Sequence, residues 1–506
     1  MAMKQEIFEK YYTFNPAYVL RNDVSRTVLV TADDHSLKGL DVDDVITLIH
    51  PVYAMLLSFF NGRKRLSESV SDASEFFNVS EEDIRKIISK MLDNENDIGV
   101  EYDNNFFYLP SKLLIERQEW MNIPLYQPGQ FDIDCDVDLK SKRLNIPVYM
   151  SLLVNNRCRT DCIYCYADKR RIYDCTIPFG RLQEIIAEAR SIGIVSFDLQ
   201  GGELFLYPEW DMLLKELFKA GYTVYISTKY PLTREEIERL KEAGVEEIQI
   251  SLDSIYADDL MANLRVEKVY RDKILAAVSM LDAAGISMKM KSVITSPIFN
   301  LGRLEEYIRY FNQFENVKIV ELTAPARSLY KSQDDFEHYR LSPGQIKSIL
   351  GLAKRMIANK EVSFELRTDI PEPEKNQNES PDEKRKVFLR RSQCSGNMTS
   401  FMVLPNGDVT ICEEAYFNKN LCLGNILHTS IMDMWNSEKA RGLFYIPQSA
   451  FPKESPCSAC PEFKECRYGK GVCWTEAMAA YGEDNWMFPV PSCPHAPSGY
   501  NDILIW

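Results

Sequence analysis

Apolar and polar positions follow different patterns in successive parts of the chain. In about the first 110 residues, short apolar runs predict two strands, at 18–23 and 27–31, and helical spacing predicts three helices, at 43–60, 66–77 and 80–93. Two further runs, 99–102 and 105–109, predict a hairpin. This order predicts a winged-helix-like α+β domain over residues 1–110, followed by a linker over 111–144.

A second pattern covers residues 145–345, where apolar strand-like runs alternate with helical runs. The predicted strands are 148–154, 195–199, 223–227, 247–252, 287–293 and 317–322. The predicted helices are 179–192, 210–220, 233–243, 270–284 and 303–314. Six β/α units predict an α/β fold with a parallel sheet, curled or open. Ligands of such sheets bind at the C-terminal ends of the strands.

The third pattern covers residues 391–506, which are rich in Cys, Pro and Gly and poor in long periodic elements. Such a segment needs covalent or metal staples to hold a fold. Residues 346–390 are predicted to form a bridging helix and a linker, because the stretch 371–386 is polar and rich in Pro and Glu.

Composition narrows the class of protein. The 506 residues are 45% apolar and 26% charged, as in an ordinary globular protein. The net charge of −15 argues against nucleic acid as a partner. The longest apolar stretch, 45–60, is shorter than the ~20 residues of a membrane span, and the N-terminus does not resemble a signal peptide. We therefore expect a cytoplasmic protein with no membrane partner.

The unusual feature is thirteen cysteines beside five histidines. In a reducing compartment, clustered cysteines more often bind metal than form disulfides. Cys158, Cys162 and Cys165 follow the strand 148–154 with C-x3-C-x2-C spacing. Three thiolates on one loop can hold three irons of a [4Fe–4S] cluster and leave the fourth iron open. Zinc is the alternative, but it would need a fourth ligand.

This motif, written CRTDCIYC, resembles the signature of the radical S-adenosylmethionine (SAM) superfamily. The resemblance implies a partial (β/α)6 barrel and a SAM molecule chelated by the open iron, which is cleaved to a 5′-deoxyadenosyl radical that abstracts a substrate hydrogen. It also implies SAM contacts at the strand ends. These are a GGE motif for the SAM amine and polar side chains for its carboxylate and ribose: Gly201, Gly202, Glu203, Ser227, Thr228, Ser251 and Asp253.

The C-terminal cysteines resemble the SPASM domain of radical SAM enzymes. Carried over by position, the first auxiliary [4Fe–4S] cluster would be held by Cys394, Cys412 and Cys473. The second would be held by Cys457, Cys460, Cys466 and Cys493. The spacing from Cys466 to Cys473 is longer than the family pattern. Cys422 is a possible fourth ligand of the first cluster, and a zinc-ribbon-like staple is the alternative for the whole region. We expect Cys135 and Cys175 to be ordinary buried thiols.

The N-terminal pattern resembles the peptide-recognition element of ribosomal-peptide maturases, which binds a leader peptide by strand addition. Together the resemblances predict an enzyme that installs an intramolecular thioether or carbon–carbon crosslink in a precursor peptide. They also imply an electron donor such as flavodoxin or ferredoxin. One enzymatic alternative is a formylglycine-forming sulfatase maturase. Against it stand the N-terminal peptide module and Glu413, which follows Cys412 where those enzymes tend to carry an aspartate base. The other enzymatic alternative is a peptide epimerase, and Glu413 is the candidate catalytic residue. The non-enzymatic alternatives are an iron–sulfur electron carrier and a zinc-stapled peptide-binding scaffold.

Overall fold

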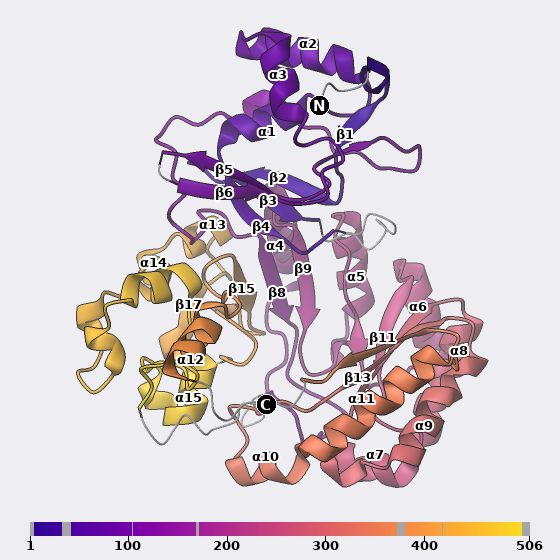
Figure 1. Ribbon diagram of the computed structural model, residues 1–506. Coiled ribbons are helices and arrows are strands. Elements are labelled where there is room, and N and C mark those ends of the chain that lie inside the picture. The colour runs from indigo at the N-terminus through magenta and orange to yellow at the C-terminus, as the bar shows by residue number, and fades with distance from the viewer. Residues whose placement is uncertain are drawn as a thin grey trace. The chain divides into compact units, whose positions relative to one another are not determined.

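The structure is a computed structural model that describes residues 5–32, 42–103, 105–167, 172–371, 380–416 and 418–497. The chain divides into two units (Figure 1). The first contains Met1–Val148 and Arg190–Ser196, and the second contains Tyr149–Ala189 and Phe197–Trp506.

In the described residues of the first unit there are three small antiparallel sheets and three α-helices. Its strands are β1 (Tyr12–Phe14), β2 (Tyr18–Asn22), β3 (Thr27–Thr31), β4 (Ile46–Ile49), β5 (Ile98–Tyr102), β6 (Asn105–Leu109) and β7 (Leu114–Glu116). Its helices are α1 (Pro51–Ser58), α2 (Leu66–Phe77) and α3 (Glu81–Ile88). The sheets are β2-β3-β4, β5-β6 and β1-β7. Strand β7 lies in the segment predicted as a linker. Asn104, between β5 and β6, lies outside the described residues.

The predicted helix 43–60 is wrong in its first half. Ile46–Ile49 forms strand β4, which pairs antiparallel with β3. Three of its four residues are Ile or Thr, whose branched side chains favour strands. The helix begins only at Pro51, a residue suited to the first helical position, and the Nδ1 atom of His50 accepts a hydrogen bond from the Val52 amide.

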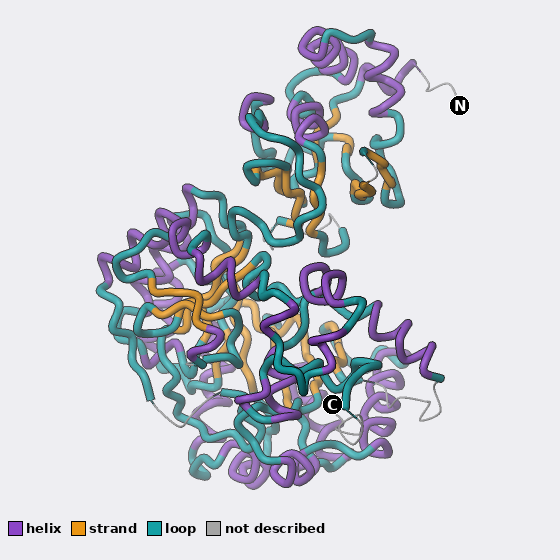
Figure 2. Tube along the Cα trace, turned by 90° about the vertical axis from the view of Figure 1, so that its left-hand side faces the viewer, coloured by secondary structure: helices purple, strands orange, loops and turns teal. Residues whose placement is uncertain are grey.

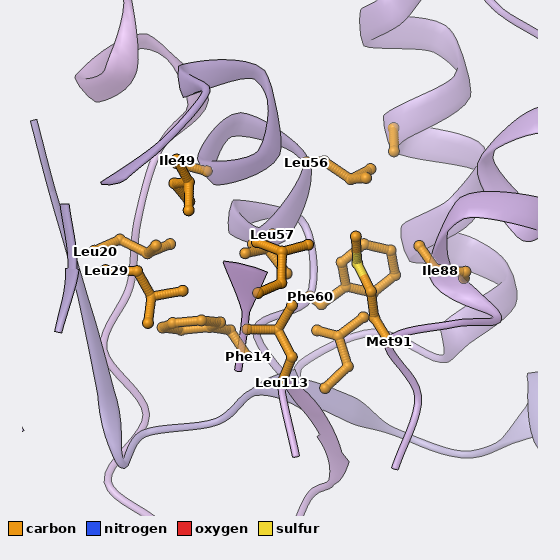
Figure 3. Close-up of a cluster of buried hydrophobic side chains, with 14 of the residues drawn as sticks. Phe14, Leu20, Leu29, Ile49, Leu56, Leu57, Phe60, Ile88, Met91 and Leu113 are labelled. Carbon is orange, nitrogen blue, oxygen red and sulfur yellow. The ribbon is translucent and has the colours of Figure 1, made fainter. Parts of the chain in front are cut away.

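One hydrophobic core joins the helices and strands of the first unit (Figure 3). Leu20 and Leu29 come from the β2-β3-β4 sheet, Leu57 from α1 and Ile88 from α3. All four are at most 4% exposed. Because each helix contributes to this core, the unit does not depend on the cysteines for its fold.

The second unit contains the predicted β/α units. Its barrel strands are β8 (Tyr149–Leu153), β9 (Ser196–Gln200), β10 (Ser227–Thr228), β11 (Glu247–Ser251), β12 (Ser287–Val293), β13 (Val317–Thr323) and β14 (Glu365–Asp369). Its helices are α4 (Phe179–Ser191), α5 (Trp210–Lys219), α6 (Arg234–Ala243), α7 (Ala257–Leu264), α8 (Tyr270–Ala283), α9 (Leu301–Tyr310), α10 (Gln333–Tyr339) and α11 (Pro343–Ala358). Strands β10 to β14 form one parallel sheet, whereas β8 and β9 belong to another. The α/β barrel is therefore partial and not closed.

Alternation along the strands gives the parallel sheet two different faces. On β12, Met288 and Met290 are buried and face the same way, and helices α6, α8 and α9 lie along one side of the strands (Figure 1). Lys289 and Lys291 alternate with them on the opposite face. The polar face is thus free to line a ligand site, as expected for a barrel interior.

The C-terminal part continues the second sheet. Strand β15 (Ser400–Val403) pairs parallel with β8, and β16 (Asp408–Thr410) and β17 (Cys422–Asn425) extend the order to β17-β16-β15-β8-β9. Around them lie α12 (Pro381–Leu389), α13 (Ile431–Trp435), α14 (Glu438–Phe444) and α15 (Trp474–Tyr481). Figure 2 shows strands in the interior of the second unit, with helices and long loops around them. Within the predicted linker, residues 372–379 lie outside the described residues.

Across the described ranges, none of the helices combines the length and apolar character needed to cross a membrane.

Candidate active site and cluster sites

The loop after β8 brings three predicted ligands to the C-terminal end of a strand. Cys162 is buried, Cys165 is half-buried and Cys158 is exposed. The loop is fastened to the end of α7, because the Asp161 and Ile163 amides each donate a 2.9 Å hydrogen bond to a backbone carbonyl there. No disulfide joins any of the thirteen cysteines, all of which lie in described segments. The loop is therefore held by its backbone while its thiols stay unbridged.

Gly201 and Gly202 follow β9 and pass against this loop. A Cβ atom on Gly202 would lie 1.9 Å from the Arg157 carbonyl oxygen, and one on Gly201 would lie 2.6 Å from the Asn155 carbonyl oxygen. Gly201 also has a φ of +148°, a conformation that favours glycine. Both glycines are therefore required by the close approach of two protein segments.

Glu203 is only 5% exposed, and its carboxylate meets the next strand. The Thr228 hydroxyl lies 2.8 Å from both carboxylate oxygens and donates to them. Burial raises the pKa of Glu203 to about 7, against the opposing effect of the Thr228 hydrogen bond. The structure thus brings the predicted residues Glu203 and Thr228 into direct contact.

Asp253 lies beneath the cysteine loop and is 3% exposed. Its Oδ2 accepts hydrogen bonds from the Tyr164 hydroxyl at 2.6 Å and from the Asn263 amide at 2.9 Å, and its Oδ1 lies 3.2 Å from the Lys229 ammonium. Tyr164 is the aromatic residue directly before Cys165. Asp253 therefore anchors the cysteine loop through Tyr164.

Lys229 is a site residue that the sequence analysis missed. Burial works to lower its pKa, but Asp253 and the nearby Cys162 outweigh that effect and raise it. The ammonium also lies 5.7 Å from the centroid of the Tyr164 ring. In the sequence, the only indication that Lys229 belongs to the site was its position directly after Thr228, at the end of a strand. Lys229 is therefore a half-buried cation beside the first cysteine group.

Ser227 and Ser251 are brought together on the polar face of the sheet. Their hydroxyl oxygens are 3.3 Å apart, and the Gln249 amide donates to Ser227 at 2.6 Å and to Ser251 at 3.0 Å. On the same face, Glu321 pairs with both Lys289 at 2.6 Å and Lys291 at 2.8 Å. The two lysines share one carboxylate, so this triad has a net positive charge.

Three C-terminal cysteines form the group predicted for the first auxiliary cluster. Burial raises the pKa of Cys412, and Cys473 and Cys394 lie close enough to raise it further. Burial also raises the pKa of Cys473 to about 12. The longer spacing before Cys473 is accommodated by a π-helical turn at Glu465–Lys470, after which the Gly471 backbone lies against Cys394. Cys422 begins β17, and its thiol donates a 3.5 Å hydrogen bond to the Gly424 carbonyl.

The other four C-terminal cysteines line one pocket: Cys457, Cys460, Cys466 and Cys493. Burial raises the pKa of Cys493 to about 11, and the other three thiols add to that effect. Arg391 and Arg467 oppose the rise in the pKa of Cys466 that burial causes. Within the described ranges, no three His, Cys, Asp or Glu side chains are close enough to hold a single metal ion.

Glu413 connects the C-terminal part with the first cysteine loop. Burial raises its pKa, and so does its neighbour Glu414. Burial is the main cause of the raised pKa of Tyr166, and the charges of Glu413 and Cys165 raise it further. Tyr166 is therefore near both of these groups. Of the cysteines outside the three groups, Cys135 is exposed rather than buried as predicted, and Cys175 is half-buried.

Comparison with known proteins identifies the family. The radical SAM superfamily profile matches residues 152–340, and the SPASM profile, described as an iron-sulfur cluster-binding domain, matches residues 394–461. This chain is a radical SAM protein with a SPASM domain. Its cofactors are therefore SAM and [4Fe–4S] clusters. The SPASM match ends before Cys466, Cys473 and Cys493, whose grouping comes from the structure.

Two curated relatives are, by their names, a bacteriocin biosynthesis protein and a peptide cyclase. The subtilosin biosynthesis protein AlbA of Bacillus subtilis is 23% identical over 67% of this chain and 69% of AlbA. PqqA peptide cyclase of Streptomyces rochei is 23% identical over 62% of this chain and 82% of the cyclase. The fold resembles Streptococcus suis SuiB, solved with SAM (TM-score 0.61) and with its precursor peptide SuiA (0.59). In each case identity is 14%, and the alignment covers 95% of this radical SAM protein and 99% of SuiB.

Proposed function

We propose that this radical SAM enzyme installs an intramolecular crosslink, a thioether or a carbon–carbon bond, in a ribosomally made precursor peptide. One observation carries the proposal: Cys457, Cys460, Cys466 and Cys493 line one pocket, while Cys473 and Cys394 both act on the pKa of Cys412. With the three cysteines of the loop after β8, this arrangement supports the radical SAM and SPASM patterns. The names of the two relatives, a bacteriocin biosynthesis protein and a peptide cyclase, support the substrate class. We further propose that the first unit binds the leader and that flavodoxin or ferredoxin supplies electrons in a reducing cytoplasm.

The first cysteine group fits the SAM-binding cluster. SAM bound to a [4Fe–4S] cluster on Cys158, Cys162 and Cys165 supplies a 5′-deoxyadenosyl radical for hydrogen abstraction. Glu203, at the end of β9, would accept hydrogen bonds from the SAM amine, with Thr228 orienting its carboxylate. Lys229 offers a half-buried positive charge beside this group, which suits the SAM carboxylate.

Two further residues would complete the SAM site. Ser227 and Ser251 present adjacent hydroxyls for hydrogen bonds to the ligand's polar edge. We assign Asp253 mainly to holding Tyr164 and Lys229, because both its carboxylate oxygens already accept protein hydrogen bonds. The glycines act indirectly, by letting the β9 end approach the cysteine loop.

Glu413 is the candidate proton acceptor for substrate. Its carboxyl group lies beside Tyr166, next to the first cysteine group, and burial raises its pKa. A base with a raised pKa suits proton removal near neutral pH. A crosslink requires such a group when a thiol or other side chain loses its proton as the new bond forms.

The test begins with anaerobically reconstituted protein. We expect about twelve irons per chain, since each of three clusters has four, and 5′-deoxyadenosine when the reduced protein is given SAM. Cys158→Ala should retain about eight irons and lose SAM cleavage. Cys175→Ala is the matched control and should keep both, because this half-buried thiol only meets the Ile177 carbonyl. Full iron with no SAM cleavage would favour the electron-carrier alternative.

Co-expression with a short peptide encoded beside the gene then identifies the product. A thioether or carbon–carbon crosslink removes two hydrogens from the peptide, whereas epimerisation leaves its mass unchanged. Tandem mass spectrometry locates the joined residues. An unchanged mass with an inverted residue would contradict the crosslinking proposal while leaving the radical SAM chemistry in place.

A further inference from the structure

A buried arginine faces the pocket of the second auxiliary group. Arg467 is 6% exposed and lines the pocket together with Cys457, Cys460, Cys466 and Cys493. Its Nη2 atom donates to the Cys457 sulfur at 3.1 Å and to the Phe488 carbonyl at 3.1 Å. Its Nε and Nη1 atoms are also buried, yet neither has a hydrogen-bond partner.

A buried guanidinium group with two unpartnered nitrogen atoms fits a site for an anion. Arginine keeps its charge in proteins, and a buried charge is costly unless an opposite charge or hydrogen bonds compensate it. The ring centroids of Phe451 and Trp474 each lie 4.9 Å from the guanidinium carbon. These rings cover the faces of the guanidinium group but leave its Nε and Nη1 atoms without hydrogen-bond partners. Four thiolates around an iron–sulfur core would supply the compensating negative charge, so Arg467 fits the cluster predicted for this pocket.

A second arginine approaches the same group. Arg391 follows α12, and its Nη2 atom donates to the Cys466 sulfur at 3.2 Å and to the Gly471 carbonyl at 2.8 Å. Its guanidinium carbon lies 3.9 Å from the centroid of the Phe388 ring, which also lines the pocket. Arg391 is half-buried, so solvent screens its charge more than that of Arg467.

The first auxiliary group has the opposite electrostatic surroundings. Glu476 is near enough to Cys394 and Cys473 to raise the pKa of both thiols, and Glu414 in turn raises the pKa of Glu476. Carboxylates therefore border one cysteine group and guanidinium groups border the other. Both groups lie in the same unit of the chain.

We propose that Arg467, assisted by Arg391, raises the reduction potential of the second auxiliary cluster above that of the first. Reduction adds negative charge to a cluster, and hydrogen bonds to its sulfurs together with nearby cations stabilise that charge. Nearby carboxylates have the reverse effect on the first cluster. The inference rests on the proposed function, because it requires clusters on both cysteine groups. Arg467 and Arg391 act through the cluster ligands and are positioning residues.

The experiment is a potentiometric titration followed by electron paramagnetic resonance. It uses reconstituted full-length protein carrying Cys158→Ala and Cys162→Ala, so that only auxiliary clusters contribute. A further Cys412→Ala change identifies which potential belongs to the first cluster. We expect Arg467→Gln to lower the potential of the second cluster by at least a tenfold change in its reduction equilibrium, which is 59 mV for one electron.

Graded variants separate charge from geometry. Arg467→Lys keeps the charge but not the planar fork, and should give an intermediate shift. Arg391→Gln should shift the same potential by less. The matched control is Arg390→Gln, which removes the same charge from the exposed neighbour of Arg391 and should leave both potentials unchanged.

Three results would overturn the inference. They are unchanged potentials in Arg467→Gln, an equal shift in Arg390→Gln, or a second cluster that is harder to reduce than the first in the unsubstituted arginine background. If Arg467→Gln fails to retain iron, the inference is tested by Arg467→Lys and Arg391→Gln instead. A lowered potential of the second cluster in these variants supports it, and unchanged potentials overturn it. Failure of the proposed function is distinct, because it appears in the parent protein as missing auxiliary cluster signals or as full iron without SAM cleavage, whatever the arginine variants do to the potentials.

Discussion

SAM binding should weaken in acid because Glu203 must lose a proton to meet the SAM amine as a carboxylate. The side chain is 5% exposed, and burial raises its pKa to about 7 from an ordinary 4.5. Between these two values the folded protein retains a proton that the unfolded chain has released. Folding stability therefore falls as the pH rises from 4.5 to 7, by up to about 3 kcal/mol.

The same proton sets the size of the binding effect. Below about pH 7, affinity for a ligand that requires the ionised form falls about tenfold per pH unit. We therefore expect SAM to bind about 30-fold more weakly at pH 5.5 than at pH 8, a loss of about 2 kcal/mol. Thr228→Val removes the hydroxyl that favours the carboxylate, and should move the transition to higher pH.

Calorimetry on anaerobically reconstituted protein measures this dependence at constant ionic strength. Glu203→Gln keeps the shape of the side chain but cannot ionise, so it should bind SAM more weakly at pH 8. It should lack the additional loss below pH 7, which separates Glu203 from the titration of the SAM amine itself. Glu203→Gln should also raise the melting temperature at pH 8. Parallel pH curves for the parent protein and Glu203→Gln would refute the reasoning.

Three substitutions test other parts of the structure. Gly202→Ala should abolish the SAM-binding cluster, measured as iron content, because its Cβ atom would lie 1.9 Å from a backbone oxygen of the cysteine loop. Gly351→Ala, on the exposed side of α11 with open space around it, should instead stabilise the protein by about 0.5–1 kcal/mol in denaturant unfolding. Asp23→Asn should destabilise the first unit by about 3–5 kcal/mol, since it breaks a fully buried 2.9 Å pair with Arg26. Breaking the exposed pair on α3 should cost under about 1 kcal/mol in the same assay. Equal costs for the buried and exposed pairs would contradict this account of burial.

The sequence predicted elements well where one local rule decided the structure. Helix α2 has the predicted bounds, 66–77, because its apolar spacing and its ends agree. The segment 43–60 contained two competing signals, a β-branched run and a helical period, and pairing with β3 decided in favour of a strand. The predicted strand 223–227 is reduced to Ser227–Thr228, where it pairs with β11. Strand β14 was missed because its short polar sequence becomes a strand only beside β13.

The candidate site was also predicted only as far as local sequence patterns reach, because contacts between distant residues could not be foreseen. Spacing on one short loop predicted the first cysteine group, whereas the two C-terminal groups were carried over from the resemblance to the SPASM domain, since Cys412 and Cys473 are far apart in the sequence. Spacing could not predict the part played by Lys229, because its burial results from Tyr164 and Asp253, which are far apart in the sequence. The arginines at the second auxiliary group could not be predicted from the sequence either, because Arg391 is 75 residues away from the cysteine it contacts.

One short segment fixes the first auxiliary group relative to the SAM-binding loop. Cys412 belongs to the proposed first auxiliary group, Glu413 is near enough to raise the pKa of Tyr166, and the Glu414 carbonyl accepts a 2.6 Å hydrogen bond from Tyr330. Tyr416 is 2% exposed and packs in a cluster with Leu153 at the end of β8 and with Cys165. Because successive residues of this segment contact both sites, neither site can move without disturbing the other. A substrate side chain held between them would therefore meet the radical source and Glu413 at a separation set by the protein's own core.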